Sequence, residues 1–120
     1  MILGVGLDLA DIERIEKAIQ NPRFLERIFS EEERAQIEKK GAQTAAGYFA
    51  AKEAVAKAFG TGFNGFSPWD ISVHCDELGK PEVVLHRGAM EKLNALGAQM
   101  IVSITHTGGM AAAVAILSKD

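Results

Sequence analysis

The chain has 120 residues, enough for one domain with a hydrophobic core, and it is small enough that oligomerisation would help its stability. Its 13 Lys and Arg residues against 16 Asp and Glu residues give a net charge of −3, which excludes general nucleic-acid affinity. No apolar run is long enough to span a membrane, no signal peptide is visible, and a single cysteine excludes a disulfide framework. We expect a globular cytoplasmic protein.

The first ten residues alternate in the pattern of a β-strand, with branched apolar residues on one face. Gly4, Gly6 and Asp8 lie on the other face, where the glycines leave room for another backbone, a helix or a ligand. Asp is uncommon in strands, and the residue best placed to cap the following helix is Asp11. Asp8 is therefore left without a local role, and it becomes a candidate metal ligand.

Three short helices are predicted next. The first begins at Asp11, the second has Pro22 in its first turn, and the third opens with capping-box spacing at Ser30–Glu33 and runs toward Gly41. Arginines on the first two helices are interleaved with acidic residues, which is typical of a solvated face of mixed charge. The alternative is a patch that docks an acidic macromolecule. These arginines are Arg14, Arg23 and Arg27.

The most informative segment runs from Phe49 to Gly62 and reads Phe-Ala-Ala-Lys-Glu-Ala-Val-Ala-Lys-Ala-Phe-Gly-Thr-Gly. It predicts a helix that is apolar nearly all round, and such helices are buried. Lys52, Glu53 and Lys57 therefore need partners or mark a functional site. The alternative is an ordinary surface pair of Glu53 with Lys57, four residues apart, while Lys52 reaches outward. Because the helix lacks a polar face on which these charges would be exposed to solvent, we favour the functional interpretation.

Asp8 and Glu53 together offer two hard oxygen ligands, with no nitrogen or sulfur nearby in sequence. Such a pair suits Mg²⁺, which keeps several waters and takes other ligands from substrate phosphates. Zinc is not favoured, because the single cysteine and the three histidines show no ligand spacing. Lys57 and the Gly60-Thr61-Gly62 amides could face phosphate oxygens, although a glycine turn after a helix is normally a plain cap.

The second half of the chain is rich in hairpin signals, and one strand followed by helices and then hairpins indicates an α+β domain. We predict a single domain over residues 1–120, with helices packed on an antiparallel sheet. The predicted elements are strands at 71–75 and 82–86, a helix at 87–96, and strands at 100–105 and 110–117. His106 follows at a strand-to-turn junction, where sites often occur, although a lone histidine there is more often structural. Cys75 is predicted to be a small core residue.

Three motifs in this order and spacing resemble holo-[acyl-carrier-protein] synthase, the short bacterial branch of the 4′-phosphopantetheinyl transferase family. They are Gly4-Val-Gly-Leu-Asp-Leu, the segment from Phe49 to Gly62, and Val102-Ser-Ile-Thr-His-Thr. With Arg14, Arg23-Phe24 and Leu78-Gly-Lys-Pro81, the similarity covers nearly the whole chain. The resemblance implies Mg²⁺-dependent transfer of phosphopantetheine from coenzyme A to a serine of apo-acyl carrier protein. Adenosine 3′,5′-bisphosphate would be released, and the reaction would serve fatty acid biosynthesis.

The resemblance also implies roles for individual residues. Asp8 and Glu53 would hold the metal, and Lys57 would contact the pyrophosphate. The arginines Arg14, Arg23 and Arg27 match the family's docking surface for carrier protein, and the family's short members are homotrimers with active sites between subunits. Further contacts with coenzyme A would come from Gly60, Thr61, Gly62, Lys80, Pro81, His106 and Thr107.

One departure from the family pattern concerns the residue before the Phe-Ala-Ala-Lys-Glu-Ala segment, where the family often has Arg and this chain has Tyr48. That Arg helps to hold the nucleotide's 3′-phosphate, so another residue would have to make the contact here. For the general base, we favour Glu53 acting through a metal-associated water over solvent water alone. Two other classes remain open: a Mg²⁺-dependent phosphohydrolase with the same metal pair, and a non-catalytic trimeric module that binds carrier protein or nucleotide.

Overall fold

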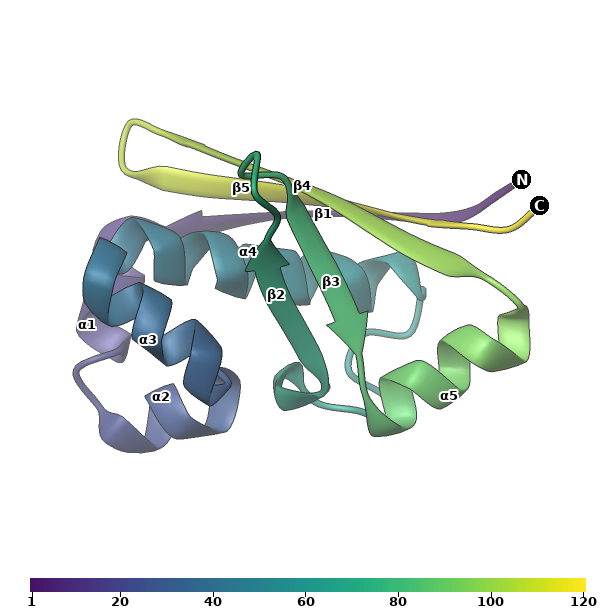
Figure 1. Ribbon diagram of the computed structural model, residues 1–120, viewed down its shortest axis with the longest axis horizontal. Helices are drawn as coiled ribbons and strands as arrows, with labels where there is room; N and C mark the ends of the chain where they lie inside the picture. Colours follow the sequence, from purple (N-terminus) through teal and green to yellow (C-terminus); the bar gives the residue numbers. More distant parts are fainter.

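A computed structural model describes residues 1–120, and it is an α+β fold with antiparallel strand pairing, as the sequence predicts (Figure 1). No helix is both long and apolar enough to cross a membrane. The elements in chain order are β1 (Ile2–Asp11), α1 (Ile12–Ala18), α2 (Pro22–Ile28), α3 (Glu31–Lys40), α4 (Ala42–Ala58), a 3₁₀ turn η1 (Pro68–Asp70), β2 (Ile71–Cys75), β3 (Pro81–Leu85), α5 (Arg87–Leu96), β4 (Gln99–Thr107) and β5 (Met110–Ser118).

The strands form two antiparallel units rather than one sheet. β1, β5 and β4 make a three-stranded sheet in that order, with β5 in the centre, while β2 and β3 pair as a separate hairpin. The long helix α4 lies along one face of the three-stranded sheet, and the other helices and the hairpin lie on the same side (Figure 1). The two chain termini meet at one end of the sheet, where Lys119 N donates to Met1 O.

Glycines allow α4 to approach β1 at backbone contact distance. A Cβ at Gly6 would overlap the carbonyl oxygen of Ala54, and a Cβ at Gly4 would overlap that of Ala58. The glycine face of β1 is therefore the face that receives a helix, one of the occupants that the sequence predicted for it.

The branched apolar face of β1 is the exposed one. Leu7 and Leu9 are 63% and 64% exposed, and Ile101 on β4 is also exposed. Buried alanines of β5 supply most of the sheet's core face instead. A sheet that turns its large apolar residues toward solvent leaves a surface that another protein could cover.

A buried ion pair ties α3 to the middle of α4. Lys52 Nζ lies 2.8 Å from Glu33 Oε1, and both side chains are 1% exposed. Lys52 also donates to the backbone oxygens of Ile28 and Ile71, while Glu33 Oε2 accepts from Val73 N. Burial lowers the pKa of Lys52, while the neighbouring carboxylate opposes that shift. Lys52 therefore has internal partners and a structural role, contrary to the functional interpretation that we favoured from the sequence.

Local signals in the sequence are confirmed at the helix starts. Asp11 caps α1 by accepting from Arg14 N, and Ser30 with Glu33 forms the predicted capping box of α3. The prediction for Cys75 is wrong, because this residue at the end of β2 is exposed. His106 and Thr107 belong to β4, so the turn between β4 and β5 is confined to Gly108 and Gly109.

We expect Lys52→Ala to lower the free energy of unfolding by about 3–5 kcal/mol, because it leaves the Glu33 carboxylate buried without its charge partner. Urea denaturation measures this quantity. The control is Lys17→Ala on α1, whose solvent-exposed ion pair with Glu13 should contribute no more than about 1 kcal/mol. Equal losses for the two variants would contradict the structural role of Lys52.

Candidate functional site

The opening strand and α4 bring Asp8 and Lys57 together, although 49 residues separate them in sequence. Lys57 Nζ lies 3.0 Å from Asp8 Oδ1 and also donates to the carbonyl oxygen of Leu7 at 3.0 Å. The Asp8 side chain is 15% exposed and that of Lys57 is 53% exposed. The ammonium group is thus held by the edge of β1 and remains accessible to a ligand.

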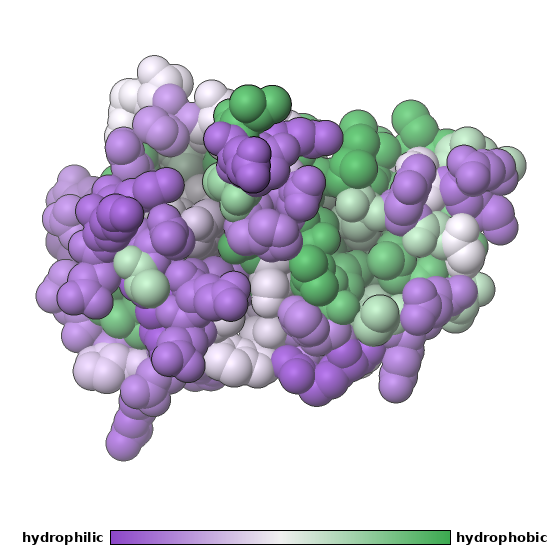
Figure 2. Space-filling model, viewed as in Figure 1, coloured by the Kyte–Doolittle hydropathy of each residue, from purple (hydrophilic) through white to green (hydrophobic).

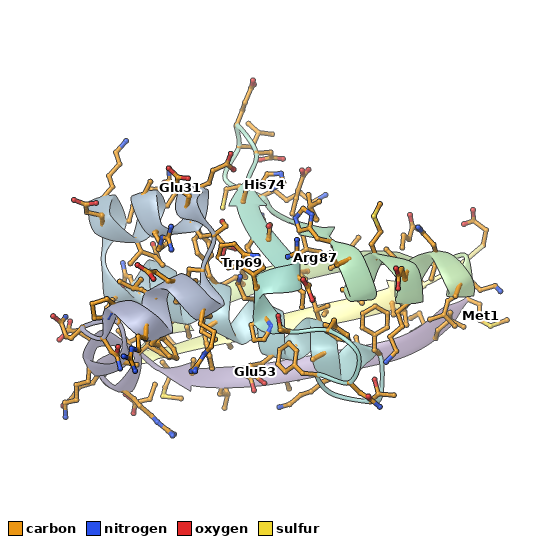
Figure 3. All side chains as sticks on the ribbon, turned by 90° about the horizontal axis from the view of Figure 1, so that it is seen from below. Met1, Glu31, Glu53, Trp69, His74 and Arg87 are labelled. Atoms are coloured by element: carbon orange, nitrogen blue, oxygen red, sulfur yellow. The ribbon has the colours of Figure 1, made fainter.

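Glu53 lies one helical turn before Lys57, on the side of α4 that faces β1 (Figure 3). Its side chain is half-buried and makes no hydrogen bond or ion pair with another residue. Partial burial raises the pKa of Glu53, the nearby Asp8 carboxylate raises it further, and Lys57 opposes the shift. The carboxylates of Asp8 and Glu53 therefore lie close enough to repel each other.

These two carboxylates fit a divalent cation that needs few protein ligands. A positive charge between them would offset both the burial and the repulsion from Asp8 that raise the pKa of Glu53. No group of three or more His, Cys, Asp or Glu side chains could hold a metal by itself. The donor set is thus two hard oxygens, which suits Mg²⁺ completed by waters and phosphate oxygens rather than zinc.

The glycine turn directly follows the C-terminal end of α4. Gly60 and Gly62 have φ values of 83° and 64°, a backbone conformation that favours glycine. Gly60 N donates to Lys57 O, so the turn continues from the residue that contacts Asp8. Thr61 is exposed, and its hydroxyl accepts a hydrogen bond of 2.6 Å from Lys92 on α5.

A pocket of about 210 Å³ joins the start of α4 to β4 and the β2–β3 hairpin. Of the residues that the sequence predicted for coenzyme A, Pro81 and His106 line it. Lys80 and Thr107 are exposed and lie outside its lining. The structure therefore brings together only part of the predicted nucleotide-binding set within one chain.

Sequence reasoning missed three polar residues in this pocket, which are Lys40, Gln43 and Thr44. They lie at the junction of α3 and α4, and no motif marks them. Tyr48 also lines the pocket and an adjoining groove of about 540 Å³. Burial, with smaller effects from Cys75 and Glu33, raises the pKa of Tyr48 to about 12, so its hydroxyl stays protonated.

The two groups of residues lie near opposite edges of the three-stranded sheet. Asp8 on β1 pairs with Ala113 on β5, which pairs in turn with Ile104 on β4. Ile104 lines the pocket, so two strand spacings, about 10 Å, separate it from Asp8. Helix α4 crosses the sheet between them, with Gly47 against β4 and Ala54 against β1.

The predicted docking arginines lie on α1 and α2. All three are exposed, and none forms an ion pair within the chain. The solvated face of mixed charge that we expected contains one pair, Lys17 with Glu13 at 3.6 Å. The surface over α1, α2 and α3 is mostly hydrophilic, whereas hydrophobic residues gather over β3 and β4 (Figure 2). The arginines are Arg14, Arg23 and Arg27.

Comparison with known proteins identifies the class to which this fold and site belong. The family model described as "4'-phosphopantetheinyl transferase superfamily" matches residues 4–111. A holo-[acyl-carrier-protein] synthase from Clostridium acetobutylicum is 50% identical, over 98% of this chain and 98% of that protein. The chain therefore belongs to the 4′-phosphopantetheinyl transferase superfamily.

Solved structures agree on the branch within that superfamily. The crystal structure of holo-[acyl-carrier-protein] synthase from Neisseria meningitidis has a TM-score of 0.90 and 32% identity, covering 99% of this chain and 100% of that one. The Helicobacter pylori enzyme in complex with coenzyme A has a TM-score of 0.84 and 34% identity, covering 95% of this chain and 99% of that one. The chain is thus an enzyme of the holo-[acyl-carrier-protein] synthase branch.

Proposed function

We propose that this enzyme transfers the 4′-phosphopantetheine group of coenzyme A to a serine hydroxyl of an apo-acyl carrier protein. The observation that carries the proposal is the accessible Lys57 ammonium paired with Asp8, beside the unpartnered Glu53 carboxylate, in a chain of this family. The holo-[acyl-carrier-protein] synthase relatives support the carrier protein as acceptor, and the Helicobacter pylori complex supports coenzyme A as donor. We propose cytoplasmic fatty acid biosynthesis as the setting.

Lys57 binds and orients the pyrophosphate of coenzyme A. Its ammonium is anchored by Asp8 and the Leu7 carbonyl, so its direction is set before substrate arrives. When the serine oxygen attacks the phosphorus that carries pantetheine, a new P–O bond forms and the bond to the leaving phosphate breaks. A fixed positive charge stabilises the negative charge that develops on the phosphoryl oxygens and on the leaving bisphosphate.

Asp8 and Glu53 would hold Mg²⁺, because the partly buried Glu53 carboxylate has no partner within the chain and lies near the Asp8 carboxylate. When bound, the metal supplies positive charge that stabilises the phosphoryl oxygens. Glu53 is also our first choice as the general base that takes the serine proton through a water. Lys57 pairs with Asp8 and not with Glu53, so a Glu53 oxygen that does not bind the metal can accept a proton.

The nucleotide end of coenzyme A would occupy the pocket that contains His106 and Pro81. Lys40 lines this pocket beside Tyr48, so its ammonium can offer a phosphate the charge that arginine supplies in the family pattern. The neutral Tyr48 hydroxyl can donate a hydrogen bond at the same place. The Gly60–Gly62 turn would face phosphate oxygens beside Lys57, and the exposed Lys80 and Thr107 would contact other parts of coenzyme A.

The carrier protein would dock on α1 and α2. Arg14, Arg23 and Arg27 are free of internal ion pairs, so they can pair with acidic side chains without breaking existing contacts. A hollow of about 310 Å³ lies beside Arg14 and is lined by apolar residues such as Phe24 and Phe49. A basic rim around an apolar hollow suits an acidic protein that presents an apolar side chain.

Three copies of the chain would form a homotrimer with active sites between subunits. The exposed apolar face of β1 and β4 supplies a surface to cover, including Leu7, Leu9 and Ile101. The separation of Asp8 from the His106 pocket supports sites shared between copies, because one chain carries the two halves near opposite edges of its sheet.

In a transfer assay with coenzyme A, apo-acyl carrier protein and Mg²⁺, we expect the intact mass of the carrier protein to rise by one phosphopantetheine group. Removal of Mg²⁺ with a chelator should abolish the mass change, because Asp8 and Glu53 then repel each other and the substrate phosphates. Release of adenosine 3′,5′-bisphosphate from coenzyme A alone would instead identify a phosphohydrolase. Binding of coenzyme A without any mass change would identify a non-catalytic module.

The same assay tests the carboxylates. We expect Asp8→Ala and Glu53→Ala each to reduce transfer by about a thousand-fold or more, as expected for removal of a charge clamp around phosphoryl oxygens. Glu38→Ala is the control, since Glu38 is an exposed residue of α3 without ion pairs. Near-normal turnover of either carboxylate variant at saturating Mg²⁺ would show that the assignment is wrong.

We expect the double reversal Arg14→Glu and Arg23→Glu to raise the KM for the carrier protein by about tenfold or more, because like charges then face an acidic partner. The KM for coenzyme A should stay unchanged, and raising the salt concentration should narrow the difference from the unmodified enzyme. Steady-state kinetics with each substrate varied in turn measures both values. Equal changes in the two KM values would exclude these arginines as a specific docking surface.

Sedimentation equilibrium should give a mass of about 39 kDa, three times the 12.9 kDa of the chain. Leu7→Asp should shift the population toward monomer and reduce transfer, because it adds a charge to the apolar face that the copies would share. A fully active enzyme at the monomer mass would overturn the shared-site arrangement.

A further inference from the structure

Lys92 on α5 makes four close interactions with the segment that follows α4. Its Nζ donates to Thr61 Oγ1 at 2.6 Å and to the carbonyl oxygen of Asn64 at 3.2 Å. The same ammonium lies 5.7 Å from the ring centroid of Phe59 and 5.5 Å from that of Phe66. One ammonium group thus contacts residues before and after the Gly60–Gly62 turn. This turn lies between α4 and α5 in Figure 1.

The segment from Gly60 to Gly65, which contains the Gly60–Gly62 turn, makes few hydrogen bonds within itself. Gly60, Gly62 and Gly65 all have positive φ values, between 64° and 87°, and glycine can also adopt many other conformations. Within this segment, Asn64 N donates to Gly62 O, and the Thr61 hydroxyl makes only a long contact of 3.4 Å with the same oxygen. A glycine-rich segment of this kind loses much conformational freedom when its amides take fixed directions, so an external contact helps to define where they point.

The aromatic residues of this segment pack against one another, but this packing does not fix the backbone conformation of the glycines. The rings of Phe59 and Phe63 each pack edge-on against Phe66, with centroids 5.5 Å apart. A Cβ at Gly88 on α5 would overlap Gly65 O, so the far end of the segment is also held close to α5. Between these anchors, Lys92 makes the one side-chain hydrogen bond to Thr61 from outside the turn.

We propose that Lys92 is a positioning residue for the transfer reaction, which holds the Gly60–Gly62 turn in the geometry that receives the phosphates of coenzyme A. The inference rests on the proposed function, because it assigns a purpose to the turn. Lys92 acts through the turn, by its hydrogen bonds to Thr61 and Asn64 and by its contact with the two phenylalanine rings. Lys57 and Lys92 then have different tasks: Lys57 contacts the ligand, and Lys92 orders the backbone next to it.

The experiment compares Lys92→Met with Lys92→Arg. Methionine keeps an unbranched apolar side chain over the rings but removes the charge and both hydrogen bonds, whereas arginine keeps charge, donors and stacking. For Lys92→Met we expect the Kd for coenzyme A, measured by titration calorimetry, and the KM for coenzyme A to rise about tenfold. The KM for the carrier protein should not change, and Lys92→Arg should recover most of the affinity.

Two controls make the result decisive. Glu91→Gln changes the exposed neighbour of Lys92 on α5, and it should bind coenzyme A as the unmodified enzyme does. In a Thr61→Val background, Lys92→Met should weaken the binding of coenzyme A by less than it does alone, because the hydrogen bond from Lys92 to Thr61 is already absent. A lower unfolding midpoint of Lys92→Met with an unchanged Kd, or fully additive effects in the double variant, would overturn the proposal.

The outcomes for the proposed function are separate from those for Lys92. An unmodified enzyme that binds coenzyme A but never modifies a carrier protein would reject the transfer reaction. The calorimetric comparison of Lys92→Met with Lys92→Arg would still decide whether this lysine orders the turn for the ligand.

Discussion

The structure depends on the close approach of α4 to β1. Gly4 and Gly6 remove the side chains that would keep a helix away, and Ala54 and Ala58 bring the helix backbone directly onto the strand. At this distance the side chain of Lys57 reaches Asp8 across the interface. Larger residues on either element would widen the spacing between helix and strand, and the charged groups would no longer meet. Small residues that pack a domain core thus also set the geometry of its site.

Two lysines on α4 illustrate how position around one helix decides the role of a charge. Lys52 faces α3 and β2, where it is buried from solvent. Its ammonium donates there to the Glu33 carboxylate and to backbone oxygens. Lys57, five residues later, lies at the edge of the sheet and keeps about half of its surface accessible. Removing water from the first makes its partners essential for stability. The second keeps water around its charge, so its ion pair contributes less to stability.

The remaining parts of the site are arranged around α4 rather than gathered on one side of it. The helix crosses the three-stranded sheet, so its beginning helps to form the His106 pocket and its end approaches Asp8. A glycine turn continues from that end, and α5 supports the turn through Lys92. The sheet's opposite face carries exposed apolar residues. The architecture thus leaves the candidate site residues in two separate groups, and an exposed apolar sheet face, in a single chain.

Features that depend on neighbours within a few residues could be predicted from the sequence. The caps at Asp11 and Ser30 are hydrogen bonds to backbone three residues away, so the pattern of residue types is sufficient to identify them. The placement of glycines beside Asp8 likewise indicated that a helix or another group would approach that face. The motifs were specific enough to indicate the family, because their order and spacing extend over nearly the whole chain.

Features that depend on segments distant in sequence were decided only by the tertiary structure. The sequence showed that Lys52 needed a partner, but Glu33 meets it only because α3 packs on α4. Cys75 has the alternation of a core strand, yet it is the last residue of β2, where the strand leaves the core and becomes exposed. Lys40 joins the His106 pocket without any local motif. Residue spacing specifies which face of an element a side chain occupies, whereas packing specifies what that face meets.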